Sequence, residues 1–217
     1  NGIGYADILF DMSDVQEEDL PYVGILQSAL GVIDTKKHGY GELFNEINMH
    51  TGGIVTSLEL YNDVTKVKEK EFKATFEIKT KALYDKLPFA FDMMGEILTE
   101  SCLDDTKRMK EILAMLKSRL LMKFQSSGHT TAALRALSYA SPSAKLKDMT
   151  NGVDFFRKVD WLDTHFEEEK EHLSEKLKEL SVKLFRADRM MLSYTAAGEG
   201  LEGFEKMVQS LKDRLYT

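Results

Sequence analysis

One stretch of the sequence limits the fold more than any other, because it alternates strictly between apolar and polar side chains. Residues 72–79 read FKATFEIK, in which every second residue is apolar and the residues between them are polar or charged. A β-strand turns successive side chains to opposite faces, so this period of two predicts a strand with one buried face and one solvated face. The chain therefore needs a sheet that is covered on one side.

Three further segments predict strands that can join the same sheet. The alternation recurs over residues 6–12, and residues 54–61 and 190–194 also favour strands. A short polar connection joins 54–61 to 72–79, which is typical of an antiparallel pair. From these patterns we expect the inner face of the sheet to be formed by Ile8, Phe10, Phe72, Phe76, Ile78 and Leu192.

Apolar residues at helical spacing fill most of the remaining chain. The predicted helices span residues 17–33, 42–50, 85–101, 105–125, 129–140, 153–184 and 200–215, with a break in the sixth expected near Asp163. This order of elements is that of an α+β fold, an antiparallel sheet with helices packed on it. No linker rich in proline, glycine or serine divides the sequence, so we expect a single domain over residues 1–217.

The charge and the cysteine content argue against several classes of protein. The net charge is −7, which disfavours a nucleic-acid partner held through its phosphates. Cys102 is the single cysteine, so neither an internal disulfide nor a cysteine-based metal cluster can form. The longest nearly apolar run, residues 22–33, is too short to span a bilayer, and we expect no membrane partner. Because the sequence begins at Asn1, we expect a piece of a longer chain.

The densest group of candidate metal ligands lies in HFEEEKEHL, residues 165–173. On a helix, His165, Glu169 and His172 are close enough together to share one zinc ion. The apolar stripe of the same helix lies about a quarter turn away, so both histidines face water beside glutamates. A zinc site also needs further ligands and a sheltered cavity. A solvated helix face is therefore the favoured interpretation, and an independent metallohydrolase that uses this cluster is the weakest alternative.

Several stretches of the chain have a distinctive amino-acid sequence. Within residues 9–61 they read LFDMS, LPYVGILQSALG, YGELFNEINMHTGG and SLELY, and further on SGHTTAALRALSYASP and RMMLSYTAAGEGLEGF. In these stretches the chain resembles the pitrilysin/insulinase superfamily of zinc metallopeptidases, and within it the presequence-protease branch. The order of the predicted elements agrees with the resemblance over essentially the full length.

The resemblance implies a parent enzyme with four related α+β units, arranged as two halves around a closed chamber. The first unit of such proteins holds zinc with an inverted motif, H-x-x-E-H, on its first long helix. Here the corresponding positions are Gly24, Gln27 and Ser28, which offer neither zinc ligands nor a general base. Glu111 is the nearest equivalent of the further glutamate ligand, and it stands alone. The resemblance therefore implies the third unit, the start of the C-terminal half, with no catalytic residue and no cofactor of its own.

On this basis we expect a non-catalytic, chamber-forming domain of a zinc-dependent peptidase that degrades unstructured peptides. Its partners would be the other units of the same chain and the peptide substrates. Its compartment would be the cytoplasm in a bacterium, or a mitochondrion or plastid in a eukaryote. The alternative is a free-standing, inactive scaffold subunit that pairs with a separate zinc-bearing chain. The sequence identifies no substrate-binding residue.

Overall fold

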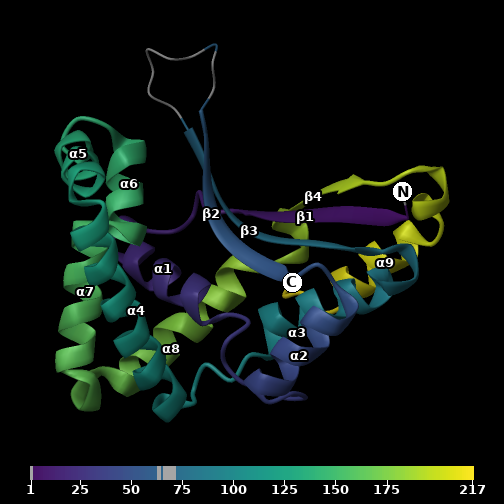
Figure 1. Cartoon of the computed structure of the whole chain (residues 1–217), viewed down its shortest axis with the longest axis horizontal. Coiled ribbons are helices and arrows are strands. Elements are labelled where there is room, and N and C mark those ends of the chain that lie inside the picture. Colours follow the sequence, from purple (N-terminus) through teal and green to yellow (C-terminus); the bar gives the residue numbers. More distant parts are fainter. Residues whose placement is uncertain (1, 63–64, 66–71) are drawn as a thin grey trace.

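Four antiparallel strands form the sheet on which the rest of the fold is built (Figure 1). The computed structural model describes residues 2–62, 65 and 72–217. The strands are β1 (Ile3–Asp11), β2 (Ile54–Asn62), β3 (Phe72–Leu83) and β4 (Met190–Thr195), in the order β2-β3-β1-β4. Each neighbouring pair is antiparallel, as expected from the sequence. The strand order leaves β2 and β4 at the edges.

The register of the sheet sets the inner face. Ile8 pairs with Ile78 and with Leu192 across the two neighbouring strands, and Phe10 pairs with Phe76. Ile8, Phe10, Phe76 and Ile78 are completely buried, which confirms these four of the six predicted inner residues. The other two, Phe72 and Leu192, also pack against the core but are only partly buried, because Phe72 begins its strand and Leu192 lies on an edge strand.

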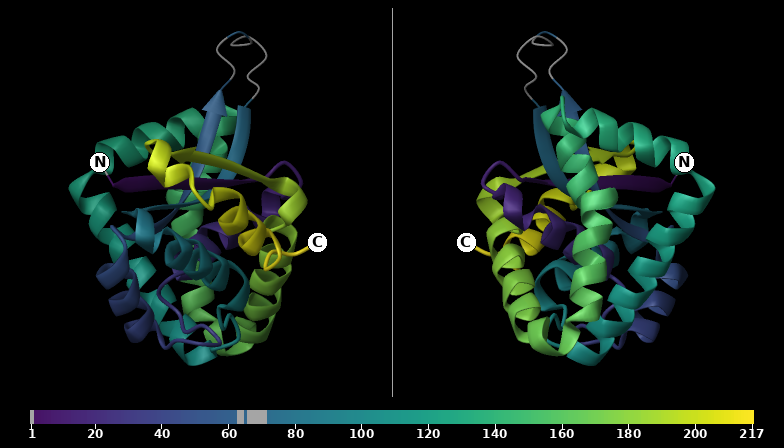
Figure 2. Two further views of the ribbon diagram at one scale, coloured as in Figure 1. Left: turned by 90° about the vertical axis from the view of Figure 1, so that its right-hand side faces the viewer. Right: turned by 90° about the vertical axis from the view of Figure 1, so that its left-hand side faces the viewer.

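Helices cover one side of the sheet (Figures 1 and 2). Their bounds are α1 (Leu20–Ala29), α2 (Tyr40–His50), α3 (Leu87–Glu100), α4 (Thr106–Ser126), α5 (Gly128–Ser138), α6 (Pro142–Asn151), α7 (Val153–Thr164), α8 (Phe166–Leu184) and α9 (Phe204–Lys212). In Figure 1, α1 and α4–α7 lie to the left beside β2, α2, α3 and α9 lie to the right below the sheet, and α8 runs between the two groups. No helix among the described residues is long and apolar enough to cross a membrane.

The helices differ from the sequence prediction at three places. The first helix is shorter than predicted, because a 3₁₀ turn at Glu17–Asp19 precedes it and it ends at Ala29. Leu30 is already extended, and Gly31 follows with a left-handed φ of +82°. The break predicted near Asp163 in the 153–184 helix lies at His165, between α7 and α8. Helix α6 was not predicted, although Ser141 caps it and Pro142 occupies its first turn, both typical start signals.

Three phenylalanines join the sheet to the helical layer. Phe185 follows the last turn of α8, and its ring meets Phe10 edge-on at 5.3 Å and Phe76 at 5.0 Å between centroids. All three rings are completely buried. Edge-to-face aromatic pairs add stabilisation to the burial of apolar area, so this cluster fixes the end of α8 against the two central strands.

The cluster generates a prediction for stability. Replacing Phe76 by alanine removes a completely buried ring, and we expect unfolding to become easier by about 3–5 kcal/mol. Urea unfolding followed by circular dichroism measures this. The matched control is Lys73→Ala on the same strand, since Lys73 is exposed on the other face and its loss should change stability by less than about 0.5 kcal/mol. Equal effects of the two substitutions would contradict the assignment of the faces.

A second prediction concerns the close approach of α1 to its neighbours. A Cβ on Gly24 would lie 2.7 Å from the Phe155 ring of α7 and 2.8 Å from the Thr150 carbonyl oxygen of α6. We therefore expect Gly24→Ala to destabilise the fold by about 1–3 kcal/mol, since the backbone of α6 must move. Gly41→Ala in α2 is the control, because its Cβ would meet nothing within 4 Å. That control should be neutral or stabilising by up to about 1 kcal/mol, and a neutral Gly24→Ala would show that α1 can move aside.

Candidate functional site

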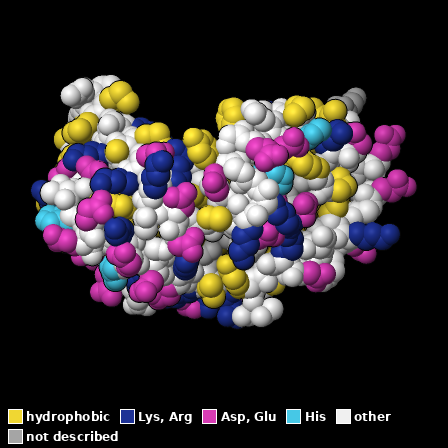
Figure 3. Space-filling model, turned by 90° about the horizontal axis from the view of Figure 1, so that it is seen from below, with side chains coloured by type: hydrophobic (Ala, Val, Ile, Leu, Met, Phe, Trp, Pro, Cys, Tyr) yellow, Lys and Arg dark blue, Asp and Glu magenta, His cyan; other side chains and the backbone are white. Residues whose placement is uncertain are grey.

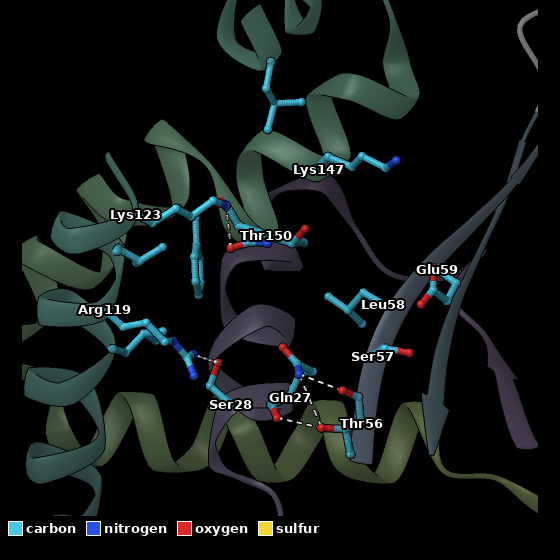
Figure 4. Close-up of a pocket in the computed structure, with 15 residues that line it drawn as sticks. Gln27, Ser28, Thr56, Ser57, Leu58, Glu59, Arg119, Lys123, Lys147 and Thr150 are labelled. Atoms are coloured by element: carbon cyan, nitrogen blue, oxygen red, sulfur yellow. Dashed lines mark hydrogen bonds between the residues drawn. The ribbon is translucent and has the colours of Figure 1, made fainter. Parts of the chain in front are cut away.

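A cavity of about 640 Å³ lies between the edge strand β2 and the helices α1, α4 and α6 (Figure 4). Helix α1 contributes Gln27 and Ser28, two of the three positions that correspond to the zinc motif of the resembled family. Strand β2 contributes four consecutive residues, 56–59. The fold thus brings two of the three motif positions to a cavity at the edge of the sheet.

Gln27 fastens α1 to β2. Its side-chain amide donates to the carbonyl oxygen of Thr56 at 3.0 Å, and the Thr56 hydroxyl donates to the carbonyl oxygen of Gln27 at 3.0 Å. Figure 4 shows these bonds on the floor of the cavity. Ser28 donates back to the carbonyl oxygen of Gly24 at 2.9 Å. Both side chains are therefore engaged with the protein's own backbone.

Gly24 does not line the cavity. It lies one turn before Ser28, beneath the Phe155 ring and the carbonyl oxygen of Thr150. A histidine at this position would need space that the backbone of α6 occupies. Two of the three motif positions thus face the cavity, and the third serves helix packing.

Cations surround the cavity. Arg119 and Lys123 lie one turn apart on α4, and Lys147 comes from α6 (Figure 4). The guanidinium of Arg119 donates to the Ser28 hydroxyl at 3.4 Å. The ammonium of Lys123 donates to the backbone oxygen of Asn151 at 2.8 Å and to its side-chain oxygen at 3.1 Å. Burial, and then the charge of Arg119, lower the pKa of Lys123.

Glu111 does not reach this cavity. It lies exposed on α4, where its carboxylate accepts a bond of 2.8 Å from Arg108, and it is not among the lining residues. The carboxylate that does line the cavity is Glu59 of β2. Glu111 is therefore not placed to act with Gln27 and Ser28 on one ligand.

The histidine cluster is divided by the break between α7 and α8. His165 lies at the break, where its Nδ1 is 2.9 Å from the carbonyl oxygen of Trp161 and its ring stacks on the indole at 5.0 Å. His172 is exposed and meets the ring of Tyr22 edge-on at 6.2 Å. Neither these residues nor Glu169 belong to a metal-holding group, since the described residues contain no such group of three or more His, Cys, Asp or Glu. That the chain binds no zinc stays a prediction.

The face of the sheet away from the helices carries a second polar group, which sequence analysis did not single out. Glu77 is completely buried there, and it accepts bonds from Thr75 at 2.6 Å and Tyr61 at 2.7 Å and pairs with Lys79 at 2.6 Å. Burial opposes ionisation, but these three partners together lower the pKa of Glu77. The bond to Glu77 raises the pKa of Tyr61 to about 12. Burial and the nearby Glu77 raise the pKa of Asp7.

Sequence reasoning found the α1 side of the cavity and missed its cations. Arg119 and Lys123 stand at helical spacing, but nothing in their spacing shows which neighbour they face. Lys147 lies on α6, the helix that was not predicted. The side chains at the cavity can bind an anion through charge and hydrogen bonds. Among the lining residues, Glu59 is the one carboxylate and there is no histidine or cysteine.

Comparison with known proteins identifies the family of the chain. A family model described as "Peptidase M-16C associated" matches residues 1–162. Protein HypA of Clostridium perfringens is 32% identical over 212 residues, 97% of this chain and 21% of that protein. The mitochondrial presequence protease of Drosophila melanogaster is 26% identical over 216 residues, 97% of this chain and 20% of that protein. The chain thus spans about a fifth of the length of these relatives.

The solved structures show the same fold. The crystal structure of pitrilysin aligns with a TM-score of 0.60 at 16% identity, over 100% of this chain and 21% of that one. A conserved protein from Enterococcus faecalis aligns with a TM-score of 0.61 at 12% identity, over 95% of this chain and 47% of that one. Because the family model covers most of the sequence, the chain belongs to the peptidase M-16C-associated family, as a unit of the presequence-protease type.

Proposed function

We propose that the chain is a non-catalytic unit of a zinc-dependent peptidase that degrades unstructured peptides, and that it forms part of the wall of the peptidase chamber. One observation carries the proposal. In a chain that belongs to a peptidase-associated family, the motif positions Gln27 and Ser28 are bonded to the protein's own backbone, and Gly24 is enclosed by α6 and α7. The zinc would be held by another unit of the parent enzyme.

The exposed face of the sheet supports the proposal that this unit contacts other units of the parent enzyme. Its large apolar side chains remain exposed, with Tyr5 at 52%, Val55 at 59% and Met191 at 66%. Exposed apolar side chains on the uncovered face of a sheet are available for contact with another unit. The helical side carries intermixed acids, bases and exposed apolar side chains, as Figure 3 shows.

The relatives support a longer parent. The chain spans about a fifth of the length of HypA and of the presequence protease of Drosophila. We propose that residues 1–217 form one α+β unit whose partners are the other units of the same chain, rather than a free-standing scaffold subunit. Relatives include mitochondrial and chloroplast presequence proteases, so the compartment we propose is an organelle in a eukaryote and the cytoplasm in a bacterium.

The first test concerns zinc. We expect less than about one tenth of a zinc ion per chain after dialysis against trace zinc, because a sheltered set of three or four ligands is needed for tight binding. Elemental analysis of the purified chain measures this. The doubly substituted His165→Ala, His172→Ala chain is the control for weak surface binding. One tightly held zinc per chain that this control loses would favour the independent metallohydrolase.

The second test concerns the wall. In the longer protein, Val55→Glu together with Met191→Glu should reduce kcat/KM for long peptides by at least about tenfold, because charged side chains would be buried at the contact. Zinc content should stay unchanged. The control is Met122→Glu with Val182→Glu, which are exposed on the helices and should leave cleavage within about twofold. Equal losses in the two variants would contradict a contact made through this face of the sheet.

A further inference from the structure

The cations at the cavity are not balanced by carboxylates. Neighbouring bases on the same helices are paired: Lys117 of α4 with Asp160 and Asp163 at 2.8 Å, and Lys145 of α6 with Glu17. Within the described residues, none of the three cations at the cavity, Arg119, Lys123 and Lys147, forms an ion pair. The hydrogen bonds of Arg119 and Lys123 go to neutral hydroxyl, carbonyl and amide oxygens.

The position of Lys123 shows that the charged form of its side chain is destabilised. The side chain is partly buried, and burial together with the charge of Arg119 lowers its pKa. A partly buried cation beside a second cation is stabilised when an anion approaches both. Arg119 adds a planar group of donors that suits a carboxylate. The cavity is therefore better suited to an anion than to water alone.

The edge of the sheet lies beside these cations. Strand β2 has a partner on one side, β3, and its other edge faces the cavity. The carbonyl oxygen of Thr56 points off this edge, since the amide of Gln27 donates to it. Backbone groups alternate along a strand, so the N–H and C=O of Leu58 point the same way. A strand edge of this kind can pair with an extended peptide.

We propose that this cavity binds the carboxylate of an extended peptide, with the peptide backbone along the free edge of β2 and the carboxylate among Arg119, Lys123 and Lys147. The carboxylate is either the C-terminus of the peptide or an acidic side chain. That the ligand is a peptide rests on the proposed function. The anion site itself rests on the cavity and its unpaired cations.

Size and composition separate this ligand from other anions. A cavity of about 640 Å³ is far larger than a single ion needs, and falls in the range of sites for organic ligands. Leu58, Leu116 and Phe155 supply apolar lining for the body of such a ligand. Glu59 stands on the same strand and would repel an anion placed beyond the cations. The carboxylate is therefore expected near α4 and α6.

Binding can be measured with the 217-residue chain and a short, fluorescein-labelled peptide rich in valine and threonine. Four forms separate the sources of charge: a free C-terminus, an amidated C-terminus, an amidated peptide with one internal glutamate, and the same peptide with lysine instead. Fluorescence anisotropy should show that one or both carboxylate forms bind at least about tenfold more tightly than the neutral amide, and the lysine form more weakly still. N-methylation of alternate backbone amides should weaken binding by about tenfold if the strand edge is used.

The variant Arg119→Gln, Lys123→Gln, Lys147→Gln should lose at least about tenfold in affinity for the carboxylate peptide. The control carries the same change of net charge at exposed lysines outside the cavity, in Lys107→Gln, Lys206→Gln, Lys212→Gln, and should stay within about twofold. Equal losses in the two variants, equal binding of the neutral amide, or preferential binding of inorganic phosphate would overturn the proposal.

These results are separable from those of the chamber-wall test. If the peptides fail to bind while the Val55→Glu, Met191→Glu protein still loses cleavage, the anion site is wrong and the proposed function stands. If the carboxylate peptide binds as described while those sheet variants cleave normally, the anion site stands without its place in the chamber. Because the peptide forms are compared on the unaltered chain, misfolding of a variant cannot produce the expected result.

Discussion

The packing of Phe185 against Phe10 and Phe76 is the interaction on which the other features of this unit depend. It fixes the end of α8 to the two central strands, and so commits one face of the sheet to the helices. The other face must then accept polar and charged side chains, and Glu77 is buried there among its partners rather than in the core. A sheet covered on one side by its own chain presents its second face to whatever lies beyond.

The packing of the helices on one face of the sheet also forms the cavity at the edge of β2. Helix α1 is held to that strand by the reciprocal bonds between Gln27 and Thr56, and it approaches α6 and α7 closely because Gly24 has no side chain. Helix α4 then stands opposite α1, with Arg119 reaching Ser28. A second anchor holds the segment after α1, where the buried Glu96 of α3 accepts a bond of 2.5 Å from Thr35 and lies 2.7 Å from the ring of His38.

The strands could be predicted from the sequence because one face is buried and the other is not. Because of that difference, apolar and polar residues alternate with a period of two in residues 72–79 and in β1. This alternation made it possible to predict Ile8, Phe10, Phe76 and Ile78 as core residues. The order of the strands left no such trace, so the edge position of β2 could not be foreseen. The cations at the cavity come from two helices, α4 and α6, that are brought together only in the folded chain. No local sequence pattern predicts that these two helices lie beside the same cavity.

The replaced motif and the cations have a common electrostatic consequence. A divalent metal at the cavity would meet Arg119, Lys123 and Lys147, and repulsion from these three cations, which form no ion pair within the described part of the chain, would oppose its binding. Restoring histidines and a glutamate at positions 24, 27 and 28 would therefore not restore a zinc site. The histidine at 24 has no room, and a glutamate at 27 would lose the amide that donates to Thr56. The features that disfavour a metal here, neutral hydrogen-bonding groups and positive charge beside a free strand edge, are those that suit a peptide carboxylate.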